Sequence, residues 1–281
     1  MTPGQLPYFD FLLSELAKQN PAVEKSFGRH VHWGYWENPR TASYDDDDYA
    51  RAAEQLTREL CGLAEITEGY RVLDVGCGFG GTIASLNERF GRLRLSGLNI
   101  DARQLARARQ QVLPLRENSV EFHEGDACAL PFPDNSFDRV LAVECVFHFP
   151  SREVFFREAG RVLRPGGVLV LSDFVPSGLF RPLCGSGTSS GSRKLNAFGS
   201  TNMQYTIGRY RRLAAQTGFV SGMERNITRH TLPTYRYLQL MLARSAVSGR
   251  AGTVGRALGL VRLLGVSGLL KYYLLAFGKP S

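Results

Sequence analysis

The sequence has few cysteines and lacks the features of an exported protein. Its five cysteines are odd in number and do not show the paired spacing of zinc ligands or of a disulfide framework. This pattern excludes a disulfide-rich secreted scaffold and favours small buried thiols in a reducing compartment. The first 20 residues lack a basic start and carry Asp10 and Glu15 within their apolar part, so no signal peptide is expected. We therefore expect a cytoplasmic protein.

No long apolar run is free of charges. The most apolar segment, residues 253–281, contains Arg256, Arg262 and Lys271, which leave no uninterrupted stretch of about 18 apolar residues. This excludes a membrane span. We predict instead a helix that packs on the core, followed by an edge strand at 272–277. An amphipathic helix on a membrane surface is the alternative.

Clusters of charge that would bind a polyanion or a metal are also missing. The formal net charge is +8, but the basic residues are spread along the chain and form no stripe with interleaved aromatic residues. A nucleic-acid partner is therefore not expected. The four aspartates at 45–48 cannot all face one ion and stand before a predicted helix, where capping and the helix dipole favour them. No metal site is predicted.

What the sequence does contain is a strand, a tight turn and a helix start within residues 71–81. An apolar run ends at Asp74, and Gly76, Gly78 and Gly80 then occupy alternate positions. Glycines permit positive φ and close approach of a ligand to the backbone, and the following helix presents free N–H groups. The glycines alone also fit a dinucleotide site. The acid two places before Gly76, together with the segments that follow, distinguishes the two interpretations.

Strand and helix patterns alternate around this turn. With 281 residues, 43% of them hydrophobic, the chain can form one large domain or one domain with a cap. The expected helices are 50–63, 102–111 and 151–163, and the expected strands are 93–100, 120–124, 137–144 and 168–174. This alternation predicts an α/β fold with a parallel sheet covered on both faces, whose ligands bind beyond the carboxyl ends of the strands.

The character of the sequence changes after residue 176. A stretch rich in glycine and serine extends to residue 200 and predicts a mobile lid loop. The segments expected after it are a helix at 206–217, a strand at 219–228 and a helix at 233–245.

Asp74-x-Gly76-x-Gly78-x-Gly80 resembles the first motif of class I S-adenosylmethionine-dependent methyltransferases. The resemblance implies S-adenosylmethionine as the cofactor and S-adenosylhomocysteine as its product. It also implies a Rossmann-like fold, with a mostly parallel seven-stranded sheet, helices on both faces and an added lid or cap. We accordingly divide the chain into an N-terminal helix and aromatic flap (1–48), a cofactor-binding core (49–175) and a lid with C-terminal strands that complete the sheet (176–281).

The resemblance also implies contacts to the methionine and ribose parts of the cofactor. The glycine turn would hold the methionine part, with Asp74 ordering the loop. Class I enzymes commonly have an acid at the position of Asn99, so this chain departs from the general pattern. It matches a small-molecule subgroup with G-[IL]-[NST]-[ILV]-x-x-x-Q, in which Asn99, Ile100 and Gln104 would take the ribose. Asp101 is the alternative ribose ligand.

Two further segments would complete the cofactor site. Gly125-Asp126-Ala127 resembles the adenine segment, in which the Asp126 carboxylate would accept from the exocyclic amine and the Ala127 amide would reach the ring. Glu144 is assigned to the wall of the site. The aromatic segment 27–39 is interpreted either as a hydrophobic plug on the core or as a flap over the cleft, and Tyr35 within it is a candidate cofactor contact.

Residues 142–150, AVECVFHFP, and the later VLRPGGVLVLSDF indicate a subfamily. They are similar to the E-S-x-x-H-x-P…RVLRPGG…DF pattern of rebeccamycin sugar O-methyltransferase-like, tocopherol C-methyltransferase-like and spinosyn-cluster enzymes, and HWGYW at 32–36 looks like the H-x-G-Y-W of that group. The resemblance implies a small, fairly apolar, natural-product-like acceptor and a monomer or homodimer. No Asn-Pro-Pro-Tyr or Cys-nucleophile motif of nucleic-acid methyltransferases follows the fourth strand.

The catalytic prediction rests on His148, which falls just past the end of the fourth strand on the ligand side. An imidazole accepts a proton near neutral pH. We predict that His148 is the general base for an acceptor hydroxyl and that Asp173 orients it or binds the substrate; a packing role for His148 is the alternative. O-methylation is thus the first interpretation. N- or C-methylation, and a cyclase that uses the cofactor only as structure, are its rivals.

Overall fold

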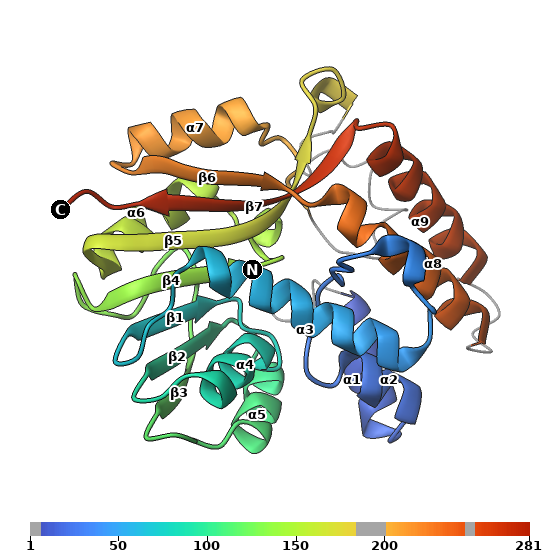
Figure 1. The fold of residues 1–281 in the computed structure, drawn as a ribbon, viewed down its shortest axis with the longest axis horizontal. Coiled ribbons are helices and arrows are strands. Elements are labelled where there is room, and N and C mark those ends of the chain that lie inside the picture. Colours follow the sequence, from blue (N-terminus) through green and yellow to red (C-terminus); the bar gives the residue numbers. More distant parts are fainter. Residues whose placement is uncertain (1–6, 184–200, 245–250) are drawn as a thin grey trace.

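A seven-stranded sheet forms the centre of the computed structural model, which describes residues 7–183, 201–244 and 251–281. The strands are β1 (Arg71–Val75), β2 (Arg94–Asn99), β3 (Ser119–Glu124), β4 (Phe137–Val143), β5 (Leu163–Pro176), β6 (Val220–Asn226) and β7 (Leu270–Gly278). Their order is β3-β2-β1-β4-β5-β7-β6 (Figure 1). Strands β1 to β5 are parallel, whereas β7 is antiparallel to β5 and β6. The predicted mostly parallel seven-stranded sheet is confirmed.

Helices cover both faces of the sheet. They are α3 (Asp46–Leu63), α4 (Gly81–Arg89), α5 (Ala102–Gln111), α6 (Arg152–Val162) and α7 (Ile207–Gln216). Successive strand residues point to opposite faces. Val72 and Leu141 accordingly join a buried cluster with α3 and α4, and Leu73 and Val140 join another with α6 and α7. Burial on both faces explains why these strands are continuous apolar runs.

Side-chain caps define the starts of several helices. Asp45 accepts a hydrogen bond from the Asp48 N–H at 2.8 Å and caps α3, so the aspartate run performs the predicted capping role. Ser151 caps α6 through the Val154 N–H. Each cap satisfies an N–H group that has no partner within the first turn of its helix.

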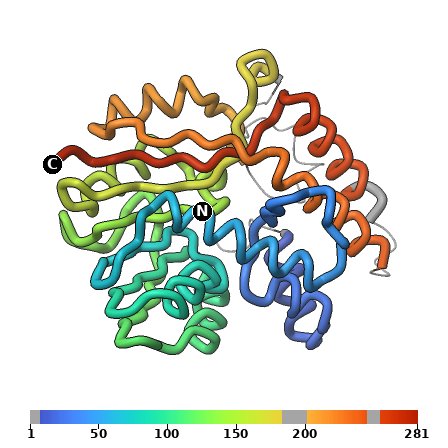
Figure 2. Tube along the Cα trace, viewed as in Figure 1, coloured from blue at the N-terminus to red at the C-terminus, as the bar shows by residue number. Residues whose placement is uncertain are grey.

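A helical cap lies beyond the carboxyl ends of the parallel strands. It consists of α1 (Pro7–Ala17), α2 (Pro21–Phe27), α8 (Thr228–Arg244) and α9 (Ala251–Val266). Figure 2 shows that the blue N-terminal segment and the orange and red C-terminal segments meet there. A third buried cluster joins them, because Phe9 and Phe27 pack with Tyr237 and Met241. Residues far apart in the sequence therefore build the cap together.

The aromatic segment 27–39 is packed into this interior. Trp33, Tyr35 and Trp36 are all buried. The Trp36 indole N–H donates to Asp48 at 2.9 Å, and the Trp33 ring packs against Tyr235 of α8 with 4.3 Å between centroids. These contacts are those of a hydrophobic plug between the sheet and the cap.

Two sequence predictions about the C-terminal region are wrong. The strand predicted at the edge, 272–277, is the interior strand β7, and β6 forms the edge. Leu274, Leu275 and Phe277 are all fully or almost fully buried, which is the pattern of a strand covered on both faces. Helix α8 begins at Thr228 and contains Pro233, although proline favours helix starts.

The other observed element boundaries differ from the expected ones by a few residues. Part of the predicted lid lies outside the described residues. Strand β5 begins at Leu163, before the start of the strand expected at 168–174, with Gly166 at φ +75°. Residues 184–200 of the predicted lid loop lie outside the described residues. Among the described helices, none is long and apolar enough to cross a membrane. The short 3₁₀ helices are η1 (Pro39–Thr41), η2 (Val146–His148) and η3 (Arg181–Leu183).

Candidate functional site

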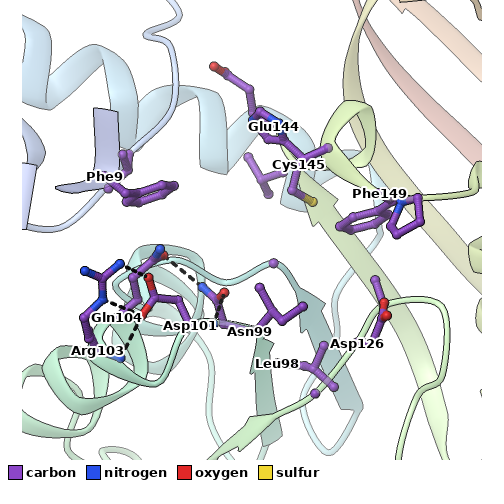
Figure 3. A pocket seen from close by; sticks show the side chains of 18 of the residues that line it. Phe9, Leu98, Asn99, Asp101, Arg103, Gln104, Asp126, Glu144, Cys145 and Phe149 are labelled. Carbon is purple, nitrogen blue, oxygen red and sulfur yellow. Dashed lines mark hydrogen bonds and ion pairs between the residues drawn. The ribbon is translucent and has the colours of Figure 1, made fainter. Parts of the chain in front are cut away.

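A pocket opens at the carboxyl ends of β1, β2 and β4, under the cap (Figure 3). This is the position at which open α/β sheets bind ligands. Its lining residues are Tyr8, Phe9, Val31, Gly76, Leu98, Asn99, Ile100, Asp101, Arg103, Gln104, Gly125, Asp126, Ala127, Val143, Glu144, Cys145, His148, Phe149 and Pro150. The structure therefore brings most of the sequence-predicted site residues together.

The glycine turn forms one edge of the pocket. Gly76, Gly78 and Gly80 have φ values of +76°, +55° and +81°, which L side chains rarely adopt. A Cβ at Gly76 would lie 2.8 Å from the Cβ of Cys145, whereas a Cβ at Gly78 would meet only Gln104 Oε1, at 4.0 Å. Gly76 lines the pocket, and Gly78 and Gly80 shape the turn around it.

Asp74 is buried at the end of β1 and does not line the pocket. Neither of its carboxylate oxygens has a hydrogen-bond partner in the part of the chain that the structure describes. Burial raises the pKa of this carboxyl to about 7, and the Thr82 hydroxyl opposes the rise only in part. An unsatisfied buried carboxyl costs stability. Its position places an ionisable carboxyl behind the glycine turn, near the Thr82 hydroxyl.

The end of β2 carries a pair of amide side chains. The Asn99 Nδ2 donates to Gln104 Oε1 at 3.0 Å, and both side chains line the pocket together with Ile100. Asp101 also lines the pocket, but its carboxylate is already engaged. It caps α5 by accepting a hydrogen bond from the Arg103 N–H at 2.9 Å, and it accepts another from the Arg103 guanidinium at 2.7 Å. Asn99 and Gln104 thus keep more free hydrogen-bonding capacity for a ligand than Asp101.

The loop after β3 supplies the opposite side of the polar wall. Asp126 and Ala127 line the pocket, and Asp126 Oδ1 accepts from the Cys128 N–H at 2.8 Å. This bond fixes the carboxylate while its second oxygen accepts no hydrogen bond from the described residues. Figure 3 shows Asp126 across from Gln104, with Leu98 between them.

Glu144 follows β4 in a strained backbone conformation. It has φ +51°, which is uncommon for a residue with a side chain and is found at functional sites. Its Oε2 accepts from the Trp33 N–H at 2.9 Å and from the Tyr272 hydroxyl at 2.6 Å. Burial raises the pKa of the carboxyl to about 8, although both hydrogen bonds lower it. Glu144 is thus a pocket residue that tends to hold a proton near neutral pH.

His148 lines the same pocket from η2 and is buried. Its ring stacks on that of Tyr8 with 6.2 Å between centroids. Phe149 and Pro150 line the same part of the pocket wall. The structure therefore places the His148 imidazole in an apolar part of the pocket.

Asp173 does not line the pocket. It is fully buried, and its Oδ2 accepts from Arg152 Nη2 at 2.8 Å and from the Tyr210 hydroxyl. Its Oδ1 accepts from the N–H of Phe174 at 2.8 Å. These bonds place Asp173 in a buried network away from the pocket, and its orienting or substrate-binding role stays a prediction.

Tyr35 also lies away from the pocket. Its ring stacks on His230 with 4.5 Å between centroids, and its hydroxyl accepts from Arg225 at 2.8 Å. The motif that contains it packs into the core, which is why the structure does not bring it to the cofactor wall.

Sequence reasoning missed the contribution of α1. Tyr8 and Phe9 line the pocket, and Asp10 pairs with Arg103 at 2.9 Å. The helical pattern of this segment was recognisable, but nothing in it indicated contact with residues about 90 positions away. Val31 and Arg103 likewise gave no local signal.

Comparisons with known proteins agree with this site. The family described as "Methyltransferase domain" matches residues 73–171. The chain is 39% identical to Methyltransferase GfsG of Streptomyces halstedii over 57% of this chain and 56% of that protein. It is 36% identical to 27-O-demethylrifamycin SV methyltransferase of Amycolatopsis mediterranei over 56% of this chain and 57% of that protein. The matches span little more than half the length of these curated relatives.

The fold is shared over a longer stretch. The crystal structure of the [4+2]-cyclase SpnF matches with a TM-score of 0.70 and 24% identity, covering 99% of this chain and 98% of that chain. Identity at this level shows the fold alone. Together with the glycine turn and the pocket at the strand ends, the family match identifies residues 73–171 as a methyltransferase domain of the class I, S-adenosylmethionine-dependent family.

Proposed function

We propose that the protein transfers a methyl group from S-adenosylmethionine to a hydroxyl group of a small, fairly apolar metabolite. The observation that carries the proposal is the composition of one pocket. Asn99, Gln104 and Asp126 form a polar wall that suits a nucleoside, and the same pocket contains His148 among aromatic side chains. The first part suits the cofactor and the second suits an apolar acceptor whose hydroxyl must lose a proton.

The residues present fit the cofactor. The glycine turn leaves space where a side chain would stand, since a Cβ at Gly78 meets nothing closer than 4.0 Å. Asp74 is buried behind that turn, where its carboxyl would order the loop, and the amides of Asn99 and Gln104 suit ribose hydroxyls. When bound, the cofactor supplies an activated methyl group, so the protein mainly has to align the acceptor, exclude water and remove a proton.

His148 is the proposed general base. It accepts the proton of the acceptor hydroxyl on a ring nitrogen. Tyr8, Phe9 and Phe149 line the pocket around it, and their rings exclude water and hold an apolar acceptor body. Asp173 has no part in this proposal because Arg152 and Tyr210 engage it.

Two measurements test the proposal. Calorimetric titration with S-adenosylmethionine and S-adenosylhomocysteine should give saturable binding of both. Incubation with S-adenosylmethionine and a panel of phenols, sugars and amines should add one methyl group to a hydroxyl-bearing compound, with release of S-adenosylhomocysteine. Absence of binding at millimolar ligand would reject the proposal.

Other outcomes of the same assay identify the rivals. Methylation at nitrogen or carbon would keep the cofactor role and change the acceptor. Conversion of an acceptor without release of S-adenosylhomocysteine would indicate a cyclase that uses the cofactor as structure. We further propose that the enzyme acts in the cytoplasm and that it is a monomer or homodimer. Sedimentation of the purified protein would test the oligomeric state.

A further inference from the structure

The Glu144 side chain is half-buried in the wall of the pocket and has no cationic partner among the described residues. Its Oε2 accepts two hydrogen bonds, from the Trp33 N–H and the Tyr272 hydroxyl, while Oε1 accepts none from the residues that the structure describes. No described cation forms an ion pair with it, although Arg103 lines the same pocket and pairs with Asp10 and Asp101. A buried carboxylate without a positive partner is costly, so the carboxyl favours its neutral form.

Among the titratable groups around Glu144, Asp173 reinforces this preference and the Tyr272 hydroxyl opposes it. Those that interact with it electrostatically are Tyr8 of α1, Tyr49 of α3, Cys145 beside it, Asp173 of β5, Tyr235 of α8 and Tyr272 of β7. None of these groups is a cation; His148 and Arg103, which can carry a positive charge, line the same pocket. Burial is the main cause that raises the pKa of the Glu144 carboxyl to about 8, and the Asp173 carboxylate adds to it.

Glu144 also stands on one particular side of the pocket. In Figure 3 its side chain and that of Cys145 lie across the pocket from Asn99, Asp101 and Gln104. The strained backbone at φ +51° and the bond from its own N–H to the Ser172 hydroxyl at 2.9 Å hold it there. A strained residue with a buried, unpaired acid at a ligand site is suited to a charge that arrives with the ligand.

We propose that Glu144 is the counter-charge for the sulfonium of S-adenosylmethionine, protonated in the free protein and ionised in the complex. The inference rests on the proposed function, because S-adenosylmethionine carries one positive charge at sulfur and S-adenosylhomocysteine carries none. Binding of the charged form is therefore coupled to release of the Glu144 proton. The neutral product lacks this partner, and the carboxyl regains its proton when the product is bound or released.

The coupling has a measurable size. A positive charge within about 4–6 Å lowers a carboxyl pKa by about 1–3 units, so a group that starts near 8 releases about 0.4 to 0.9 of a proton at pH 7. Calorimetric titration at pH 7 in buffers of different ionisation enthalpy measures this release directly. We expect that release for S-adenosylmethionine and no more than about 0.1 of a proton for S-adenosylhomocysteine. The affinity for S-adenosylmethionine should also rise with pH up to about 8 and then level off.

Two variants assign the proton to its residue. Glu144→Gln should abolish the release and reduce the preference for S-adenosylmethionine over S-adenosylhomocysteine by about tenfold or more at pH 8.5. Asp74→Asn is the matched control, because Asp74 is a second buried carboxyl with a raised pKa, about 7, that forms no ion pair with a described residue; it should retain the difference in proton release between the two ligands. If Glu144→Gln does not fold, Tyr272→Phe removes one bond that lowers the Glu144 pKa, and the levelling-off should move to higher pH.

The outcomes are separable from those of the proposed function. Equal proton release with both ligands, or release that survives in Glu144→Gln and disappears in Asp74→Asn, would overturn the inference while leaving the methyltransferase proposal intact. A failure of either ligand to bind would overturn the proposed function, and the inference with it.

Discussion

The Arg152 guanidinium and the Asp173 carboxylate form an ion pair inside the protein, with 2.8 Å between Nη2 and Oδ2 and side-chain exposures of 1% and 0%. Arg152 Nη1 also donates to the Asn202 carbonyl at 2.7 Å, and its guanidinium lies 4.5 Å from the centroid of the Tyr205 ring. The pair thus joins α6 and β5 to the chain that leads into α7.

Removal of one partner from this pair should be costly. Asp173→Asn leaves the Arg152 charge buried without its counter-ion, so we expect a loss of about 3–5 kcal/mol in the free energy of unfolding. Urea denaturation measures it. Asp134→Asn is the control, because its pair with Arg161 has exposures of 68% and 31% and should cost at most about 1 kcal/mol. An Asp173→Asn protein as stable as the parent, yet impaired in turnover, would return Asp173 to a role with the substrate.

Replacement of His148 should separate chemistry from cofactor binding. His148→Ala removes the proposed base and should lower turnover by about a hundredfold or more, while calorimetric affinity for S-adenosylmethionine changes little. The control is His123→Ala, because His123 lies on β3 outside the pocket and should leave turnover unchanged. A reduction of less than threefold for His148→Ala would end its assignment as the base.

Two glycines with similar φ values distinguish backbone strain from close contact. Gly69 has φ +81° and open space around a Cβ, whereas Gly76 has φ +76° and a Cβ that would lie 2.8 Å from Cys145. Gly69→Ala should cost about 1–2 kcal/mol from the left-handed conformation alone. Gly76→Ala should cost more in thermal or urea unfolding and should also weaken cofactor binding. Equal effects of the two substitutions on stability and on binding would contradict the close packing of Gly76 against Cys145.

The contribution of Asp74 and Glu144 to the stability of the ligand-free protein should fall as the pH rises. Burial raises the pKa of Asp74 to about 7 and that of Glu144 to about 8, whereas both groups titrate near 4 in an unfolded chain. These two carboxyls therefore bind more protons in the native state than in the unfolded state between about pH 4 and pH 8, and their contribution to stability declines across that window. The buried imidazoles of His30 and His32, whose pKa values burial lowers, act in the opposite direction below about pH 6.5. Each unit of raised pKa corresponds to about 1.4 kcal/mol at most.

Asp74→Asn should flatten this decline. The amide does not ionise, so the slope of the unfolding free energy against pH between about pH 4 and pH 7 should become less negative than in the parent protein. Urea denaturation at a series of pH values provides the measurement. An unchanged slope would show that Asp74 is already ionised in the folded protein at low pH.

Local patterns in the sequence were sufficient for the core and for most of the polar wall of the pocket. The expected helix at 102–111 is observed with the same bounds, and Gly76, Asn99 and Asp126 line one pocket. These residues follow strands whose apolar runs are recognisable, and parallel strands bring their carboxyl ends to one edge. The division at residues 48 and 175 and the role of His148 stay predictions.

Long-range packing decided what the sequence alone did not. Asp173 lies near the end of an apolar strand, as a ligand-binding acid would, but Arg152 and Tyr210 from other elements bind its carboxylate. Tyr8 enters the pocket only because α1 folds over the strand ends. The sequence by itself determined which segments are strands, turns and helices, since these depend on neighbouring residues. Only the tertiary structure decided which acid is paired in the interior and which lines the pocket, because burial and charge pairing depend on residues distant in the chain.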